Sequence, residues 1–150
     1  MPKKKRVPVV IEIRDSHEVE GETHASEFLC DGVLTELGDG WKLDYVETDG
    51  PEQSESALRV QNRTVSLSRR GAYPLEITLE QGVRHNCYYN TPAGMMHLGV
   101  YARSVDASIS PAGGRIKLAY TLDFCADLMS SNQMEIKVHP SGVKRSRYPE

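Results

Sequence analysis

The sequence predicts an all-β protein built as a single antiparallel β-barrel of about eight to ten strands. Apolar and polar residues alternate with a period of two along most of the chain, as they do in half-buried strands. Gly, Pro, Asn and Asp interrupt this alternation at short, even intervals, which is typical of sandwiches and barrels. No segment without turn signals shows helical spacing over a helix's length. A barrel is favoured because closure removes exposed sheet edges.

The first half of the chain is expected to form strands at residues 9–14, 28–37, 41–45, 58–60 and 65–67. Gly38 and Gly40 predict a tight turn, because glycine reaches the positive φ values that such turns require. Residues 61–63 predict a hairpin turn between the last two of these strands. The acidic segment 17–23 is expected to be a solvated loop.

The second half of the chain is expected to form strands at residues 75–79, 86–90, 96–109, 115–124 and 134–138. Turns rich in Gly and Pro are expected at residues 81–82, 91–94 and 110–114. Residues 123–131 leave room for one helical turn.

Charge is distributed unevenly along the chain, whose net charge is -3. The first six and last ten residues together carry +6, so the body between them carries -9. We therefore expect a barrel domain at residues 8–139 between basic tails at residues 1–7 and 140–150. A nucleic-acid-binding domain should carry its bases on one face of the folded body. Specific nucleic-acid binding is thus not expected.

Neither the cysteines nor the histidines predict a cofactor or a metal site. Cys30, Cys87 and Cys125 include no Cys-x-x-Cys pair, so they predict neither a disulfide framework nor a thiolate zinc site. His17 and His24 flank three glutamates, but their spacing is not the His-Glu-x-x-His spacing of metalloproteases. No cofactor is expected.

A binding protein is favoured over an enzyme. The chain contains no Gly-x-Ser-x-Gly elbow, phosphate loop or dinucleotide fingerprint. His85 and Cys87 share one strand face, as a thiol–imidazole pair would, but no third group is placed to orient them. No run approaches the ~18 apolar residues of a membrane helix, and no signal-peptide pattern precedes the first strand. We expect a cytoplasmic protein with no membrane partner.

Several segments of the chain resemble the YwiB-like proteins, a bacterial family of unknown function. Their pattern places an Arg near a Gly, an alternating strand that ends in a Gly turn, a Tyr-x-Thr-Pro-x-Gly segment, and a strand ending Tyr-x-Leu. In this chain the pattern occurs in order at residues 69–71, 75–82, 89–94 and 116–122, followed by the strand at 134–138. The resemblance covers most of residues 8–139. It implies a calycin-like, lipocalin-type β-barrel with no assigned activity.

Alternation also places polar side chains inside the predicted barrel. Glu47 and Arg69 each continue an otherwise apolar strand face, and a buried charge needs a partner. They either form a structural ion pair near the barrel mouth, lie at strand ends that reach water, or line a pocket. The residues expected to line that pocket are Tyr45, Glu47, Arg69, Tyr89 and Tyr120.

The leading hypothesis is a barrel that binds a small polar or anionic ligand. The planar fork of an Arg side chain matches a carboxylate or phosphate, and a barrel of this size can hold one small ligand. The alternative is a protein-interaction module with a filled barrel and no ligand, which docks a protein partner. The identity of the ligand and the oligomeric state stay open.

Overall fold

The structure, a computed structural model, describes residues 6–49, 52–61, 63–71, 74–124 and 128–141. All the regular secondary structure in this part of the chain is β-strand, so the predicted all-β fold is confirmed. The strands in chain order are β1 (Arg6–Val19), β2 (Glu22–Leu37), β3 (Gly40–Asp49), β4 (Glu52–Gln61), β5 (Thr64–Arg70), β6 (Leu75–Glu80), β7 (Arg84–Thr91), β8 (Gly94–Ser110), β9 (Gly113–Phe124) and β10 (Leu128–Pro140).

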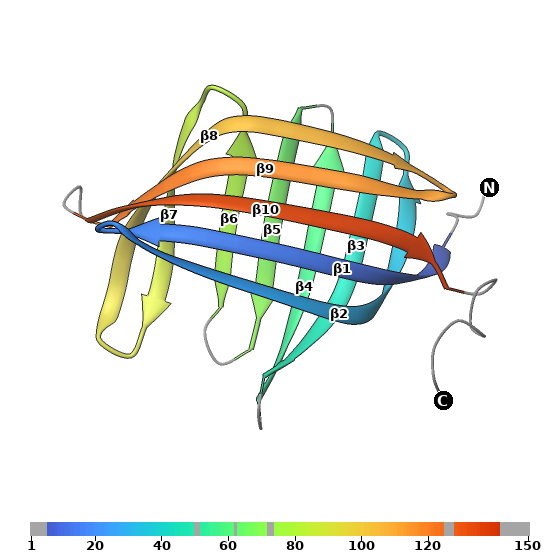
Figure 1. Cartoon of the computed structure of the whole chain (residues 1–150), viewed down its shortest axis with the longest axis horizontal. Coiled ribbons are helices and arrows are strands. Elements are labelled where there is room, and N and C mark those ends of the chain that lie inside the picture. The colour runs from blue at the N-terminus through green and yellow to red at the C-terminus, as the bar shows by residue number, and fades with distance from the viewer. Residues whose placement is uncertain (1–5, 50–51, 62, 72–73, 125–127, 142–150) are drawn as a thin grey trace.

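The strands form one antiparallel sheet in the order β6-β5-β4-β3-β2-β1-β10-β9-β8-β7. Figure 1 shows β8, β9, β10 and β1 crossing β3–β6 at a steep angle, so the sheet folds over itself into two layers. The ends of the sheet meet at the turn between β6 and β7. There the amide of Gly82 donates to the carbonyl of Ala102 at 2.8 Å, and Glu80 pairs with Val83. The sheet is therefore a nearly closed barrel, as predicted.

The core lies between the two layers and consists of the apolar side chains that alternate along each strand. These side chains come from nine of the ten strands in the described residues and pack into one cluster. The most deeply buried members are Val9, Ile11, Leu34, Leu43, Leu58, Val65, Leu79, Val100, Ile116 and Ile136. Their alternation with exposed residues is the pattern on which the prediction of strands depended.

The first hairpin corrects the sequence prediction, because the acidic segment 17–23 is not a loop. β1 continues to Val19 and β2 begins at Glu22. Glu20 and Gly21 connect them with φ values of 51° and 83°, the two positive values that a type I′ hairpin turn requires. The glutamates of this segment are exposed, so the paired strands carry their charges at little cost.

The segment 123–131, which left room for one helical turn, consists of strand wherever the structure describes it. β9 extends to Phe124 and β10 begins at Leu128, so the described residues of this segment are strands. Residues 125–127, with Cys125, lie outside the described residues. In the part of the chain that the structure covers, no helix is long and apolar enough to span a membrane.

Candidate functional site

The interior of the barrel changes from apolar to polar along its strands. The inner face of β3 passes from Leu43 to Tyr45, and that of β5 passes from Leu67 to Arg69. β1, β4, β9 and β10 contribute further polar residues by the same alternation. We call this region the polar end; its members are Asp15, Tyr45, Ser56, Arg69, Tyr120, Ser130 and Asn132.

Three of these side chains form a row on neighbouring strands. Tyr45 on β3 pairs with Ser56 on β4, which pairs with Arg69 on β5. Tyr45 and Ser56 are buried, and Arg69 is half-buried with its Nε atom hidden from solvent. Directly opposed residues have Cβ atoms only ~4.5–5.5 Å apart. A phenol, a hydroxyl and a guanidinium therefore follow one another across the inner face.

Tyr120 on β9 adds a phenol from the other layer. Burial raises the pKa of Tyr120 to about 12, with a further increase from the negative charge of Asp15 and an opposing decrease from the positive charge of Arg69. Both charges lie close enough to act on this phenol. The polar end thus combines one cation, one carboxylate and two phenols in a site largely shielded from water.

A hydrogen-bonded amide completes the polar end. Asn132 Nδ2 donates to Ser130 Oγ at 3.0 Å and, more weakly, to the carbonyl of Tyr120 at 3.5 Å. Both Asn132 and Ser130 are buried. Because this amide bonds to a hydroxyl and to the backbone, it ties the start of β10 to β9 beside Tyr120.

Two of the predicted pocket residues have side chains outside the described part of the chain. Glu47 pairs with Ser54 in the backbone register of β3 and β4, and Tyr89 pairs with Met96 in that of β7 and β8. The predicted proximity of the Glu47 and Arg69 side chains stays a prediction.

Sequence reasoning missed four members of the polar end, Asp15, Ser56, Ser130 and Asn132. Their signal was present in the alternation. Asp15 follows Ile13 by two residues, and Asn132 precedes Met134 by two. Treating residues 17–23 as a loop ended the first strand too early, so Asp15 was not assigned to a face.

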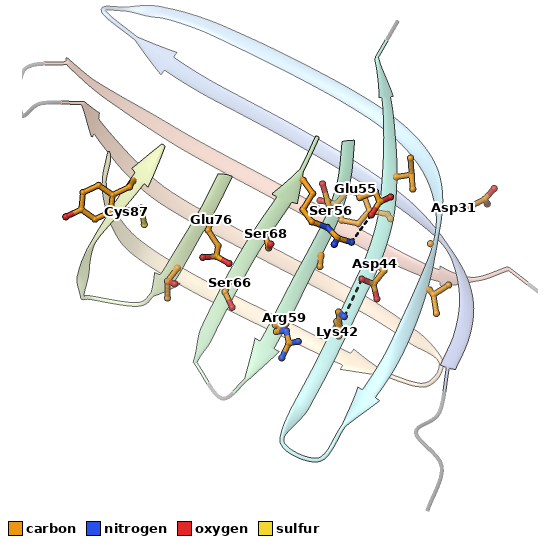
Figure 2. A pocket seen from close by; sticks show the side chains of 18 of the residues that line it. Asp31, Lys42, Asp44, Glu55, Ser56, Arg59, Ser66, Ser68, Glu76 and Cys87 are labelled. Carbon is orange, nitrogen blue, oxygen red and sulfur yellow. Dashed lines mark hydrogen bonds and ion pairs between the residues drawn. The ribbon is translucent and has the colours of Figure 1, made fainter. Parts of the chain in front are cut away.

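One large hollow lies outside the barrel, mainly on the face of β3–β6 opposite the core. This outer groove has a volume of about 1180 Å3. Figure 2 shows Ser66 and Ser68 near its middle and charged side chains along β3, β4 and β6. Within it Arg70 Nη2 lies 2.8 Å from Glu55 Oε1.

A second groove, of about 950 Å3, crosses the outer faces of β1, β2, β8, β9 and β10. Ala25 and Ala119 are among its small side chains, and Arg14 and Glu27 form an ion pair of 2.6 Å at its side. Neither groove is lined by Arg69 or Tyr120. Tyr45 and Ser56 of the polar end are, however, among the residues that line the first groove, and Asp15 is among those that line the second.

A bidentate ion pair connects β7 to β9 on the outer face of the sheet, across β8. Arg84 Nη1 and Nη2 donate to the two carboxylate oxygens of Asp123 at 2.6 and 2.9 Å. These hydrogen bonds hold the pKa of the Asp123 carboxyl below its ordinary value. The pair crosses over Gly99 on β8, where a Cβ atom would clash with both side chains. Glycine at this position is what lets the two outer strands be joined.

Contacts with other side chains of the barrel are made by His17, His24 and His85. His17 and His24 stack across the first hairpin with ring centroids 5.4 Å apart. His85 Nε2 lies 3.0 Å from Glu80 Oε1, so the recorded contact of this imidazole is with a carboxylate and not with the Cys87 thiol. Among the described residues, no group of three His, Cys, Asp or Glu side chains is arranged to hold a metal ion.

The sequence of the chain matches the model of one known protein family. Residues 11–136 match the family described as a domain of unknown function, DUF1934. The chain belongs to this family. No curated protein matches the chain.

A solved structure agrees with the barrel. The crystal structure of the YwiB protein from Bacillus subtilis superposes with a TM-score of 0.80 at 20% sequence identity, covering 90% of this chain and 92% of that chain. At this identity the match shows a shared fold. The predicted resemblance to YwiB-like proteins is thereby confirmed, together with the barrel architecture that it implied.

Proposed function

We propose that this barrel binds a small polar or anionic ligand at its polar end and that it does so in the bacterial cytoplasm. The observation that carries the proposal is the alignment of polar side chains from six strands at one end of an otherwise apolar interior. Burying polar groups costs free energy unless they are paired. A purely structural interior would use apolar residues here, as it does at the other end.

The roles of the residues follow from their chemistry. Arg69 is the group that pairs with a carboxylate or phosphate, because its planar fork donates two parallel hydrogen bonds. The hydroxyls of Tyr45 and Tyr120 donate hydrogen bonds to the same ligand, and burial raises the pKa of Tyr120 to about 12. Glu47 and Tyr89 are the two further residues proposed for the site, from the alternation of their strands alone.

A native mass spectrum of the protein purified from cells tests this proposal. We expect the wild type to carry a bound small molecule in a fixed ratio. Arg69→Lys keeps the charge but loses the bidentate fork, so the bound mass should be lost. The matched control is Arg70→Lys, because Arg70 is the next residue and points to the outer face. Equal ligand content in all three proteins, or no ligand in the wild type, would refute the proposal.

A protein-interaction module is the second candidate, and exposed apolar side chains on the β7–β8 hairpin favour it. Tyr88 and Met95 are 60% and 61% exposed, and Tyr88 packs edge-on against His97. A protein partner docked on this hairpin would appear in the same mass spectrum as a larger complex. That complex should be lost in Tyr88→Ser and kept in Arg69→Lys.

A further inference from the structure

A second polar feature lies on the outer face of β2–β6 and uses none of the side chains of the polar end. Five side chains follow one another in the register from β2 to β6 and form one line on the outer face. They are Thr35, Lys42, Arg59, Ser66 and Thr78. Neighbouring strands are ~4.8 Å apart, so the four members from β3 to β6 span about 14 Å across the groove.

Two cations in this line face each other directly. Lys42 pairs with Arg59 across the antiparallel ladder of β3 and β4, and Figure 2 shows their side chains on adjacent strands. Like charges in this position repel and destabilise a sheet. Lys42 Nζ lies 3.7 Å from Asp44 Oδ1, which is too long for a hydrogen bond. Arg59 makes no ion pair with any residue in the described ranges.

The side chains next to these cations can donate hydrogen bonds to an oxyanion. Ser66 stands next to Arg59 in the line and Thr78 stands next to Ser66; both present hydroxyls that donate hydrogen bonds. The adjoining line carries the small side chains of Ala57 and Ser68. A group of phosphate size can therefore approach the sheet closely between the cations.

Carboxylates limit how much negative charge the groove accepts. Asp44 and Glu76 stand at the two ends of the adjoining line, on either side of Ala57 and Ser68. They repel a second anionic group but accept hydrogen bonds from hydroxyls. The groove thus favours one phosphate group attached to a neutral, hydroxyl-rich remainder.

We infer that the outer groove binds a sugar phosphate. Its phosphate lies between Lys42 and Arg59 and relieves their repulsion. Its sugar extends along Ser66 and Thr78 and donates hydrogen bonds to Glu76, which lies on β6 with Thr78. Binding here is separate from binding at the polar end, since the two sites lie on opposite faces of β3–β6.

Isothermal titration of the full chain with glucose 6-phosphate, inorganic phosphate and glucose tests this inference at constant ionic strength. We expect one molecule of glucose 6-phosphate per chain, weaker binding of inorganic phosphate and no detectable binding of glucose. Lys42→Met and Arg59→Met should each weaken glucose 6-phosphate binding at least tenfold. The control Arg63→Met removes an exposed cation outside the groove and should bind like the wild type.

A second measurement, the melting temperature without ligand, tests the repulsion between Lys42 and Arg59. Without ligand, Lys42→Met and Arg59→Met should melt at or above the wild-type temperature, because each removes one of two opposed like charges. Equal weakening by Arg63→Met would show diffuse charge attraction and overturn the inference, as would unchanged binding in Arg59→Met. Equal affinity for phosphate and glucose 6-phosphate would overturn the sugar-phosphate assignment. Arg69→Lys should leave this binding unchanged, so failure of the interior proposal is recognised separately.

Discussion

The two ends of the barrel interior are built from the same strands but have different compositions. The apolar end contains Ile11, Leu58 and Ile116, which are almost completely buried and belong to one core cluster. At the polar end Arg69 is half-buried and Tyr120 keeps a hydroxyl that burial forces to stay protonated. From this difference in burial we expect the apolar end to contribute more of the stability than the polar end, where we propose that the ligand binds.

Truncation at the apolar end should give the largest effect. Leu58→Ala removes a side chain that is 1% exposed and should lower the unfolding free energy by about 2–5 kcal/mol through lost burial and the remaining cavity. Urea denaturation measures this loss. The control Leu29→Ala, at a side chain 57% exposed, should change the free energy by less than about 0.5 kcal/mol. Similar losses in the two variants would show that the apolar end does not dominate stability.

Alkaline pH should affect the polar end through Tyr120. Its folded pKa of about 12 lies above the unfolded value of about 10, so its contribution to stability is complete below pH 10. That contribution is lost as the pH rises toward 12, and two pKa steps correspond to about 3 kcal/mol. Urea denaturation between pH 9 and 12 should show this fall in the wild type but not in Tyr120→Phe. An equal fall in both proteins would contradict the burial of this phenol.

Features that are set within a single strand follow from the sequence, and features that are set between strands do not. Alternation identified the strands around Leu43 and Leu67 and placed Tyr45 and Arg69 on their inner faces, because side-chain direction depends only on the period of a strand. Register between strands depends on the geometry of the turns for neighbouring hairpins such as β3–β5, and on pairing partners far away in the chain for β1 with β10. The row through Ser56 and the approach of Asp15 to Tyr120 therefore could not be derived from spacing within one strand.

The ion-pair hypothesis for Glu47 and Arg69 is the next test of the polar end. Because alternation places both on the inner face, Arg69→Met and Glu47→Gln should be coupled. The double variant should lose less stability than the sum of the single losses, with a coupling energy of about 0.5–3 kcal/mol. Chemical denaturation of the four proteins in the cycle measures this energy. Strictly additive losses would show that the two side chains do not interact.

A smaller effect is expected from the ion pair on the outer face. Asp123→Asn should lower the melting temperature slightly at pH 7, because Arg84 loses its charged partner. The pKa of Asp123 is lowered, so its contribution is present above the unfolded value of about 3.9 and is lost as the pH falls further. The melting temperatures of the two proteins should therefore converge in strongly acidic buffer. Gly99→Ala should reproduce the loss at pH 7, since its Cβ displaces the guanidinium.

The most direct test of the division between the two ends is an affinity measurement. Isothermal titration with the small molecule released from the wild-type protein gives its Kd in Arg69→Lys at the polar end and in Ile11→Val at the apolar end. We predict that Arg69→Lys raises Kd at least tenfold while Ile11→Val leaves Kd unchanged, although Ile11→Val is the variant that lowers stability, by about 0.5–1.5 kcal/mol. Equal changes in Kd, or a change only in Ile11→Val, would contradict the assignment of binding to the polar end.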